Sequence, residues 1–172
     1  MIVIMMGVTG SGKTTVGRCL ADQLGWGFVE GDDWHPPENI QKMSQGRPLE
    51  DRDRWPWLHN LRQHIEALQQ QGQSAVVTCS ALKRSYRQVL QPQPDAAMRF
   101  VYLKGSAATL HTRLKERQQH FMKADMLDSQ LDTLEEPTGA IVVDIDDAKT
   151  PAQMAAHVMT QLNLSANSQD SN

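Results

Sequence analysis

The chain has 172 residues, which corresponds to one domain at the usual size of about 150 residues. Its hydrophobic (40%) and charged (22%) fractions are those of ordinary globular proteins and exclude a disordered or collagen-like chain. With 17 Lys and Arg against 20 Asp and Glu, the net charge is −3, so the overall basic character of nucleic-acid-binding proteins is absent. We therefore expect a single globular domain with no nucleic-acid partner.

The cysteines and the first residues bear on the compartment. The two cysteines, Cys19 and Cys79, have neither the spacing of a metal site nor that of a disulfide framework, which indicates a reducing compartment. The most apolar N-terminal stretch, residues 2–6, is far shorter than the roughly 20 residues of a membrane span and follows no basic segment. We expect a cytoplasmic protein with no membrane partner.

The first quarter of the chain alternates strand and helix patterns. Residues 2–6 are a continuous apolar run with β-branched members, which predicts a strand buried on both faces. A glycine-rich turn follows, and the apolar spacing of residues 14–24 predicts a helix. Residues 27–30 predict a weaker strand. Two prolines then open a polar, turn-rich segment over residues 36–49, which we interpret as part of an insert over a binding site.

The alternation continues to the end of the chain. Helices are expected at residues 53–71, 82–90 and 107–117, from about 121 to 134 and at 151–162, and strands at 75–79, 99–103 and 140–145. Parallel strands need crossover connections, so this order predicts an α/β fold with a five-stranded parallel sheet and helices on both faces. We expect one domain over residues 1–162, with an insert at about 36–71 and a lid at about 118–125. Residues 163–172 are polar and predict a flexible tail.

The segment from Gly7 to Thr14 reads GVTGSGKT and carries the strongest functional signal. It satisfies the pattern G-x-x-x-x-G-K-[ST] of a phosphate-binding loop, or P-loop, between a predicted strand and a predicted helix. Its glycines let backbone N–H groups face a phosphate, the helix N-terminus adds positive partial charge, and Lys13 reaches the β and γ phosphates. The Thr14 hydroxyl is suited to ligate Mg²⁺. The pattern predicts ATP binding by Gly7, Val8, Thr9, Gly10, Ser11, Gly12, Lys13, Thr14 and Thr15.

Proteins with such a loop include GTPase switches, motors and small-molecule kinases. A switch needs the guanine-reading tetrapeptide N-K-x-D, which this sequence lacks. The only D-x-x-G, residues 22–25, falls at the end of a predicted helix and not after a strand. The sequence therefore disfavours a switch.

Acidic residues follow the second predicted strand. The third strand runs into Thr78, Cys79 and Ser80, without the carboxylate that usually ends this strand in P-loop proteins. Asp32 and Asp33 instead lie near the P-loop, because strand ends meet at one edge of a parallel sheet. There Asp32 and Asp33 are suited to hold Mg²⁺-bound water or to take a proton from a substrate hydroxyl. The alternative is a solvated turn, in which Asp is common.

Two basic groups accompany these residues. Arg113 and Arg117 share one face of a predicted helix before the stretch 118–123, and a basic lid closing over ATP would neutralise charge and exclude water. An ordinary solvated helix is the alternative. The second group lies in the insert and after the third strand, where it suits an acceptor that bears a carboxylate. Its members are Lys42, Arg47, Arg52, Arg54, Lys83, Arg84 and Arg87.

Together these motifs resemble the gluconokinases, small P-loop carbohydrate kinases related in fold to shikimate and nucleoside monophosphate kinases. The resemblance spans roughly residues 2–160. Beyond the P-loop it rests on GDDWHP at 31–36, DRWPWL at 53–58, CSALK at 79–83, YLKG at 102–105 and VVDID at 142–146.

The resemblance implies phosphorylation of D-gluconate at its 6-hydroxyl by ATP with Mg²⁺, giving 6-phosphogluconate and ADP. It implies that Asp32 activates the hydroxyl, that Arg113 packs on adenine and that Arg117 acts in catalysis by contacting the transferred phosphoryl group. The residues that fit gluconate recognition are Asp32, His35, Lys42, Arg54, Lys83, Arg87 and His120. The family also implies a homodimer.

The chain departs from the family before its last strand, and two other functions remain open. Only Thr138 and Gly139 stand where the family usually has a longer charged stretch, which predicts a different adenine-side loop. One open alternative is a kinase for another small sugar acid or for shikimate. The other is a nucleotide-binding module without phosphotransfer, which would bind ATP but release no ADP in response to an acceptor.

Overall fold

The computed structural model describes residues 1–116, 122–147 and 149–166. One parallel sheet has the strand order β2-β3-β1-β4-β5. Its strands are β1 (Ile2–Met6), β2 (Gly27–Glu30), β3 (Ala75–Thr78), β4 (Met98–Lys104) and β5 (Ile141–Asp144). The predicted α/β fold with a five-stranded parallel sheet is confirmed.

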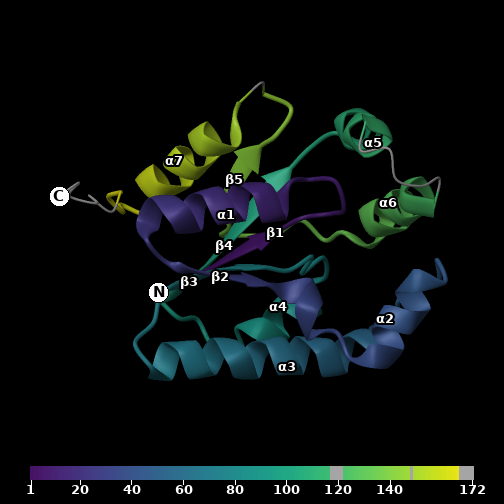
Figure 1. The fold of residues 1–172 in the computed structure, drawn as a ribbon, viewed down its shortest axis with the longest axis horizontal. Coiled ribbons are helices and arrows are strands. Elements are labelled where there is room, and N and C mark those ends of the chain that lie inside the picture. The colour runs from purple at the N-terminus through teal and green to yellow at the C-terminus, as the bar shows by residue number, and fades with distance from the viewer. Residues whose placement is uncertain (117–121, 148, 167–172) are drawn as a thin grey trace.

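Helices cover both faces of the sheet (Figure 1). On one face lie α1 (Lys13–Leu24) and α7 (Pro151–Gln161), and on the other lie α3 (Asp51–Gln70) and α4 (Arg84–Leu90). All five residues of β1 are buried. Successive side chains of a strand point to opposite faces, so a central strand covered on both sides has no polar position.

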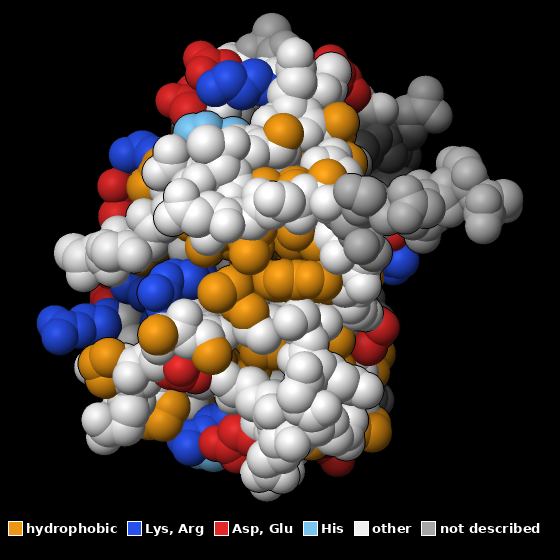
Figure 2. Space-filling model, turned by 90° about the vertical axis from the view of Figure 1, so that its left-hand side faces the viewer, with side chains coloured by type: hydrophobic (Ala, Val, Ile, Leu, Met, Phe, Trp, Pro, Cys, Tyr) orange, Lys and Arg blue, Asp and Glu red, His pale blue; other side chains and the backbone are white. Residues whose placement is uncertain are grey.

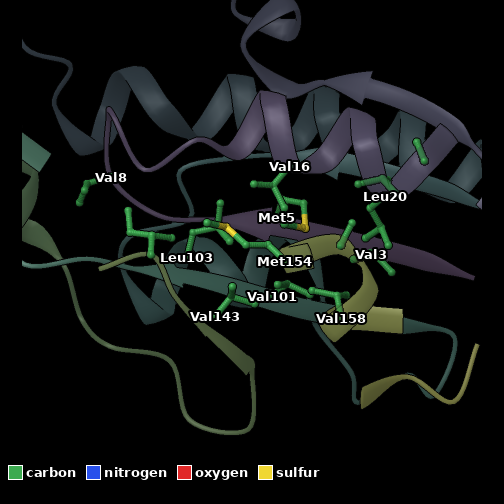
Figure 3. Close-up of a cluster of buried hydrophobic side chains, with 14 of the residues drawn as sticks. Val3, Met5, Val8, Val16, Leu20, Val101, Leu103, Val143, Met154 and Val158 are labelled. Carbon is green, nitrogen blue, oxygen red and sulfur yellow. The ribbon is translucent and has the colours of Figure 1, made fainter. Parts of the chain in front are cut away.

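Two hydrophobic clusters follow from this alternation. Val3 and Met5 belong to the cluster under α1 and α7, whereas Ile2, Ile4 and Met6 belong to the cluster over α3 and α4. Figure 3 shows the first cluster, in which side chains of α1, α7, β1, β4 and β5 meet. The central strand therefore links the two halves of the core.

The remaining helices gather at the carboxyl ends of the strands, on the right of Figure 1. They are the 3₁₀ helix η1 (Gly31–Trp34), α2 (Pro37–Ser44), α5 (Ala107–Glu116) and α6 (Met122–Thr133). In open α/β sheets this edge is where ligands bind. The N-terminus lies at the opposite end (Figure 1).

The segment expected as a polar insert is more helical than its sequence indicates. Helix α2 forms within the stretch expected to be turn-rich, with Pro37 in its first turn, where the fixed φ of proline favours a helix start. Helix α3 begins at Asp51, two residues earlier than expected, because the Asp53 carboxylate accepts a hydrogen bond from the Glu50 N–H at 2.8 Å. It is the crossover from β2 to β3 and buries Trp57 against the sheet.

The end of the described chain is held more firmly than its polar composition indicates. Leu164 packs against the cluster under α1 and α7, and its N–H donates to Met159 O at 2.9 Å. Residues 167–172 of the expected tail lie outside the described residues.

The face that carries the N-terminus, opposite the P-loop, has hydrophobic side chains gathered near its middle (Figure 2). Within the described parts of the chain, we find no helix with the length and apolar character needed to span a membrane.

Candidate active site

The P-loop connects β1 to α1, as its sequence pattern predicts. Gly10 and Gly12 have φ angles of +79° and +94°, in the left-handed region that residues with a Cβ rarely adopt. Lys13 begins α1, and its Nζ donates to Val8 O at 3.0 Å, across the loop. The glycines thus allow the backbone to curl in front of the helix N-terminus, where an anion is favoured.

A pocket of about 150 Å³ opens beside the P-loop. It is bounded by the P-loop, η1, the connection from α2 to α3, the start of α3, the end of β3 and helix α6. Gln130 of α6 accepts a hydrogen bond from the Thr9 N–H at 2.7 Å, so α6 is tied directly to the P-loop. The polar and charged residues that line the pocket include Thr9, Lys13, Asp32, His35, Arg54 and Ser80.

Asp32 reaches the pocket because Gly31 lets η1 lie against the end of β3. A Cβ on Gly31 would stand 1.9 Å from Thr78 O, a distance that no side chain tolerates. The Gly31 N–H donates to Thr78 Oγ1 at 3.1 Å, and Trp57 Nε1 donates to Gly31 O at 2.7 Å. With Gly31 held on both sides, Asp32 lines the pocket, whereas the exposed Asp33 does not.

Glu30, the last residue of β2, is a site residue that the sequence analysis missed. Its carboxylate accepts hydrogen bonds from Thr14 Oγ1, at 2.8 Å, and from Thr78 Oγ1. Glu30, at the end of β2, thus brings a carboxylate to the P-loop threonine. The neighbouring strand β3 ends without a carboxylate. The available signal was the position of Glu30, since an acidic residue closes a strand at the ligand-binding edge of the sheet.

His35 is a buried, uncharged wall of the pocket. Its side chain is 3% exposed and stacks on Trp57, with ring centroids 4.0 Å apart. Burial, and secondarily the charge of Arg54, lower the pKa of His35 to about 4, so the imidazole is neutral near pH 7. Its Nε2 lies 3.9 Å from Asp32 Oδ1.

The basic residues predicted for gluconate recognition do not all lie at the pocket. Arg54 lines the pocket, together with Arg47, whereas Lys42 and Lys83 do not. Both lysines are engaged by carboxylates of the first turn of α3. The Lys42 Nζ lies 2.5 Å from Asp53 Oδ2, and the Lys83 Nζ lies 2.8 Å from both oxygens of Asp51.

These ion pairs tie the start of α3 to its neighbours. The hydrogen bond from Lys83 is the main cause of a lowered pKa at Asp51, and the Tyr86 hydroxyl donates to the same carboxylate at 2.5 Å. The bond from Lys42 likewise lowers the pKa of Asp53. Lys42 and Lys83 therefore hold α2 and the start of α4 against the helix that presents Arg54.

Arg87 lies elsewhere. Its Nη1 donates to Ala81 O at 2.9 Å and to Leu82 O at 3.0 Å, and the residue lines a separate open groove of about 910 Å³. No P-loop residue borders this groove within the described chain. Thr138 and Gly139 border the same groove, so the short connection before β5 is not a loop of the P-loop pocket.

Arg113 of α5 borders the P-loop. Its Nη2 donates to Ile145 O at 2.9 Å, and its Nη1 would lie 3.9 Å from a Cβ built on Gly12. Ser106 directly precedes α5, and its N–H donates to both carboxylate oxygens of Asp146 at 3.0 Å. Arg117 and His120 lie outside the described residues. So do residues 118–121 of the expected lid, and residues 122–125 form the first turn of α6.

Comparisons with known proteins identify the family of the chain. The sequence pattern of a family described as an AAA domain matches residues 2–137. A gluconokinase from Gluconobacter oxydans is 52% identical over 139 residues, covering 78% of this chain and 75% of that protein. The thermoresistant gluconokinase of Escherichia coli is 44% identical over 149 residues, covering 84% of this chain and 85% of that protein. The chain belongs to the gluconokinase family.

Two solved structures show the same fold. A crystal structure of a gluconokinase from Sinorhizobium meliloti superposes with a TM-score of 0.83 at 43% identity, covering 94% of this chain and 90% of that one. A shikimate kinase from Bacteroides thetaiotaomicron superposes with a TM-score of 0.64 at 13% identity over 95% of this chain and 99% of that one, and shares the fold.

Proposed function

We propose that the protein transfers the γ-phosphoryl group of ATP to the 6-hydroxyl of D-gluconate, forming 6-phospho-D-gluconate and ADP. One observation carries the proposal: in a chain of the gluconokinase family, Lys13 of the P-loop and the carboxylate of Asp32 line the same pocket. Phosphoryl transfer needs a cation at the phosphates and a group that accepts the proton of the attacking hydroxyl. Lys13 and Asp32 meet these two needs.

The pocket favours a small acidic acceptor. Its volume of about 150 Å³ is below the usual range for ligand sites, which disfavours a nucleotide as the acceptor. Arg47 and Arg54 line it, and a guanidinium group binds a carboxylate with two parallel hydrogen bonds. The acidic neighbours of Arg54, Asp51 and Asp53, are engaged by lysines. Arg54 is therefore our first candidate for the carboxylate of gluconate.

The residues around the P-loop fit a magnesium ion. Thr14 Oγ1 donates its proton to Glu30, which leaves its lone pairs for a metal, and hard oxygen ligands suit Mg²⁺. Thr14, with the carboxylates of Glu30 and Asp32, would hold the ion, which would supply neutralisation of the phosphate charge. We also assign Arg113 to the adenine side and Arg117 to the transferred phosphoryl group, as the family resemblance implies.

The test is ADP release from Mg²⁺-ATP with D-gluconate, other sugar acids, shikimate, AMP or no acceptor. Release with gluconate, and not without an acceptor, is expected. Release with a different acid would keep the kinase and replace the substrate. Measurable ATP binding without acceptor-dependent release would instead support a nucleotide-binding module.

Two further properties are proposed from the family and from composition. A homodimer is expected, and light scattering on the purified protein should give twice the mass of one chain. A cytoplasmic location is expected from the cysteine content, and the protein should fractionate with soluble cell contents. A monomer mass would remove the dimer without affecting the proposed reaction.

A further inference from the structure

A buried asparagine stands behind the histidine of the pocket. Counted as whole residues, with the backbone included, Asn39 of α2 is 4% exposed and His35 is 7% exposed. The Asn39 Nδ2 lies 2.7 Å from Asp53 O and 3.2 Å from His35 Nδ1. One amide nitrogen thus faces both a backbone carbonyl and one ring nitrogen of the histidine.

These contacts determine where the histidine carries its proton. A backbone carbonyl only accepts hydrogen bonds, so the Asn39 atom facing Asp53 O is the NH₂ group. The same NH₂ donates to His35 Nδ1, which must therefore present a lone pair. A neutral imidazole with a lone pair on Nδ1 carries its hydrogen on Nε2.

The proton-bearing nitrogen faces the carboxylate of Asp32. The His35 Nε2 lies 3.9 Å from Asp32 Oδ1, beyond hydrogen-bond distance. The ring is held by stacking on Trp57, which is itself bonded to Gly31 O at 2.7 Å. The pocket therefore presents a fixed donor and a fixed acceptor side by side.

An alcohol matches this pair better than other small groups. One oxygen placed about 2.8 Å from each atom spans the separation, accepting from Nε2–H and donating to the carboxylate. A hydroxyl has both the lone pairs and the hydrogen that this requires. An ammonium group has no acceptor, and an ionised carboxylate has no donor.

We propose that Asn39 is a positioning residue that locks His35 as a hydrogen-bond donor, and that His35 and Asp32 together orient the phosphate-accepting hydroxyl. This inference rests on the proposed function, in which Asp32 takes the hydroxyl proton. One lone pair of the oxygen accepts from His35, and the other attacks phosphorus. As the new O–P bond forms, the bond from the γ-phosphorus to the bridging oxygen breaks and ADP leaves. The hydroxyl proton passes to Asp32, while His35 keeps its own.

The tautomer is measured without substrate or turnover. Long-range ¹H–¹⁵N NMR of the ¹⁵N-histidine-labelled protein at pH 7.5 distinguishes a protonated from an unprotonated ring nitrogen, and the His35→Gln spectrum identifies the signals. The wild type should show Nε2–H alone, and Asn39→Ala should show a mixture. Asn60→Ala, at an exposed position of α3, is the matched control and should keep the wild-type tautomer. Nδ1–H in the wild type, or an unchanged tautomer in Asn39→Ala, would overturn the lock.

Kinetics test the role of the donor. The amide nitrogen of Gln reaches about as far as Nε2, whereas that of Asn reaches only as far as Nδ1. His35→Gln should keep kcat within about 10-fold, and His35→Asn should lose about 10²-fold, the usual cost of misplacing a reacting group. ATP affinity should stay unchanged in both. The exposed His59→Gln is the control and should behave as wild type.

The outcomes separate this inference from the proposed function. Equal losses in His35→Gln and His35→Asn, with unchanged melting temperatures, would contradict the donor role. Failure of the wild type to phosphorylate gluconate would remove the proposed substrate, yet the NMR experiment would still decide whether Asn39 locks His35. If Asn39→Ala does not fold, the wild-type spectrum still tests whether His35 carries its hydrogen on Nε2. The two His35 variants still test whether His35 acts as a donor to the hydroxyl.

Discussion

Asp32 and Asp33 are neighbours in the sequence with different surroundings in the fold. Both are exposed carboxylates in η1, but only Asp32 lines the pocket with Lys13. The sequence pattern left open which of them acts, because both follow the same strand. The direction of a side chain in a short 3₁₀ turn depends on how that turn is held, here by Gly31 and Trp57.

Asp32→Asn should therefore lower kcat by about 10²-fold or more, because a positioned general base contributes at least that factor. ATP should still bind, since Lys13 and the P-loop remain. Asp33→Asn is the matched control, with the same chemical change one residue away. Steady-state kinetics with gluconate and ATP measure both, and a larger loss in Asp33→Asn would transfer the role to that residue.

His35 makes stability depend on pH. Its pKa falls from 6.5 in the unfolded chain to about 4 in the fold, so between these values the unfolded state binds more protons. The free energy of unfolding should decrease as the pH falls from about 6.5 to about 4, by up to about 1.4 kcal/mol per pH unit. Above pH 6.5 the contribution should be constant.

Urea unfolding at several pH values checks this in the wild type and in His35→Gln. The variant lacks the titrating ring, so its free energy of unfolding should fall less steeply in this window. Parallel curves for the two proteins would mean that His35 does not titrate differently in the folded state.

At the scale of elements, the site depends on where β2 ends. A Cβ on Gly31 would meet the backbone of β3 at 1.9 Å, and backbone cannot yield as a flexible side chain does. A Cβ on Gly27, at the other end of β2, would make only ordinary contacts at 3.7 Å. Gly27, which begins β2, and Gly31, which directly follows it in η1, thus have different constraints.

Gly31→Ala should cost stability at or beyond the upper end of the about 1–3 kcal/mol typical of overpacking. It should also lower kcat, because η1 and Asp32 must move away from β3. Gly27→Ala should leave activity intact and change stability much less. Chemical denaturation and initial rates measure both effects, and equal stabilities of the two variants would contradict the close approach.

At the scale of the whole molecule, the two hydrophobic clusters share β1. Val3 and Met5 serve one cluster, and Ile2, Ile4 and Met6 serve the other. Loss of either cluster exposes one face of the central strand, so neither half of the core is expected to persist alone.

Because the clusters share a strand, unfolding should be one cooperative transition, as it is for most smaller single domains. Far-UV circular dichroism follows the helices on both faces, whereas tryptophan fluorescence follows mainly Trp34, Trp55 and Trp57 on the α3 side. In a urea titration the two signals should superimpose. Separate midpoints would show that the two faces unfold independently.

The sequence by itself determined the α/β order of elements, the P-loop and the family. Apolar periodicity and a phosphate-binding loop are local patterns, because each depends on neighbours within a few residues. Helix α2 was not predicted, because Pro36 and Pro37, which stand at its start, are turn residues as well as helix starters.

The tertiary structure decided which of the predicted side chains share the pocket. Arg54 lines it, whereas Lys42 and Lys83 pair with Asp53 and Asp51, and Arg87 binds backbone carbonyls at another groove. The roles of Glu30 and Asn39 follow only from their contacts with Thr14 and His35. The sequence gives the charge of a side chain, but packing between distant segments determines which group that side chain contacts. The contacted group then determines whether the charge stabilises the fold or is available to a ligand.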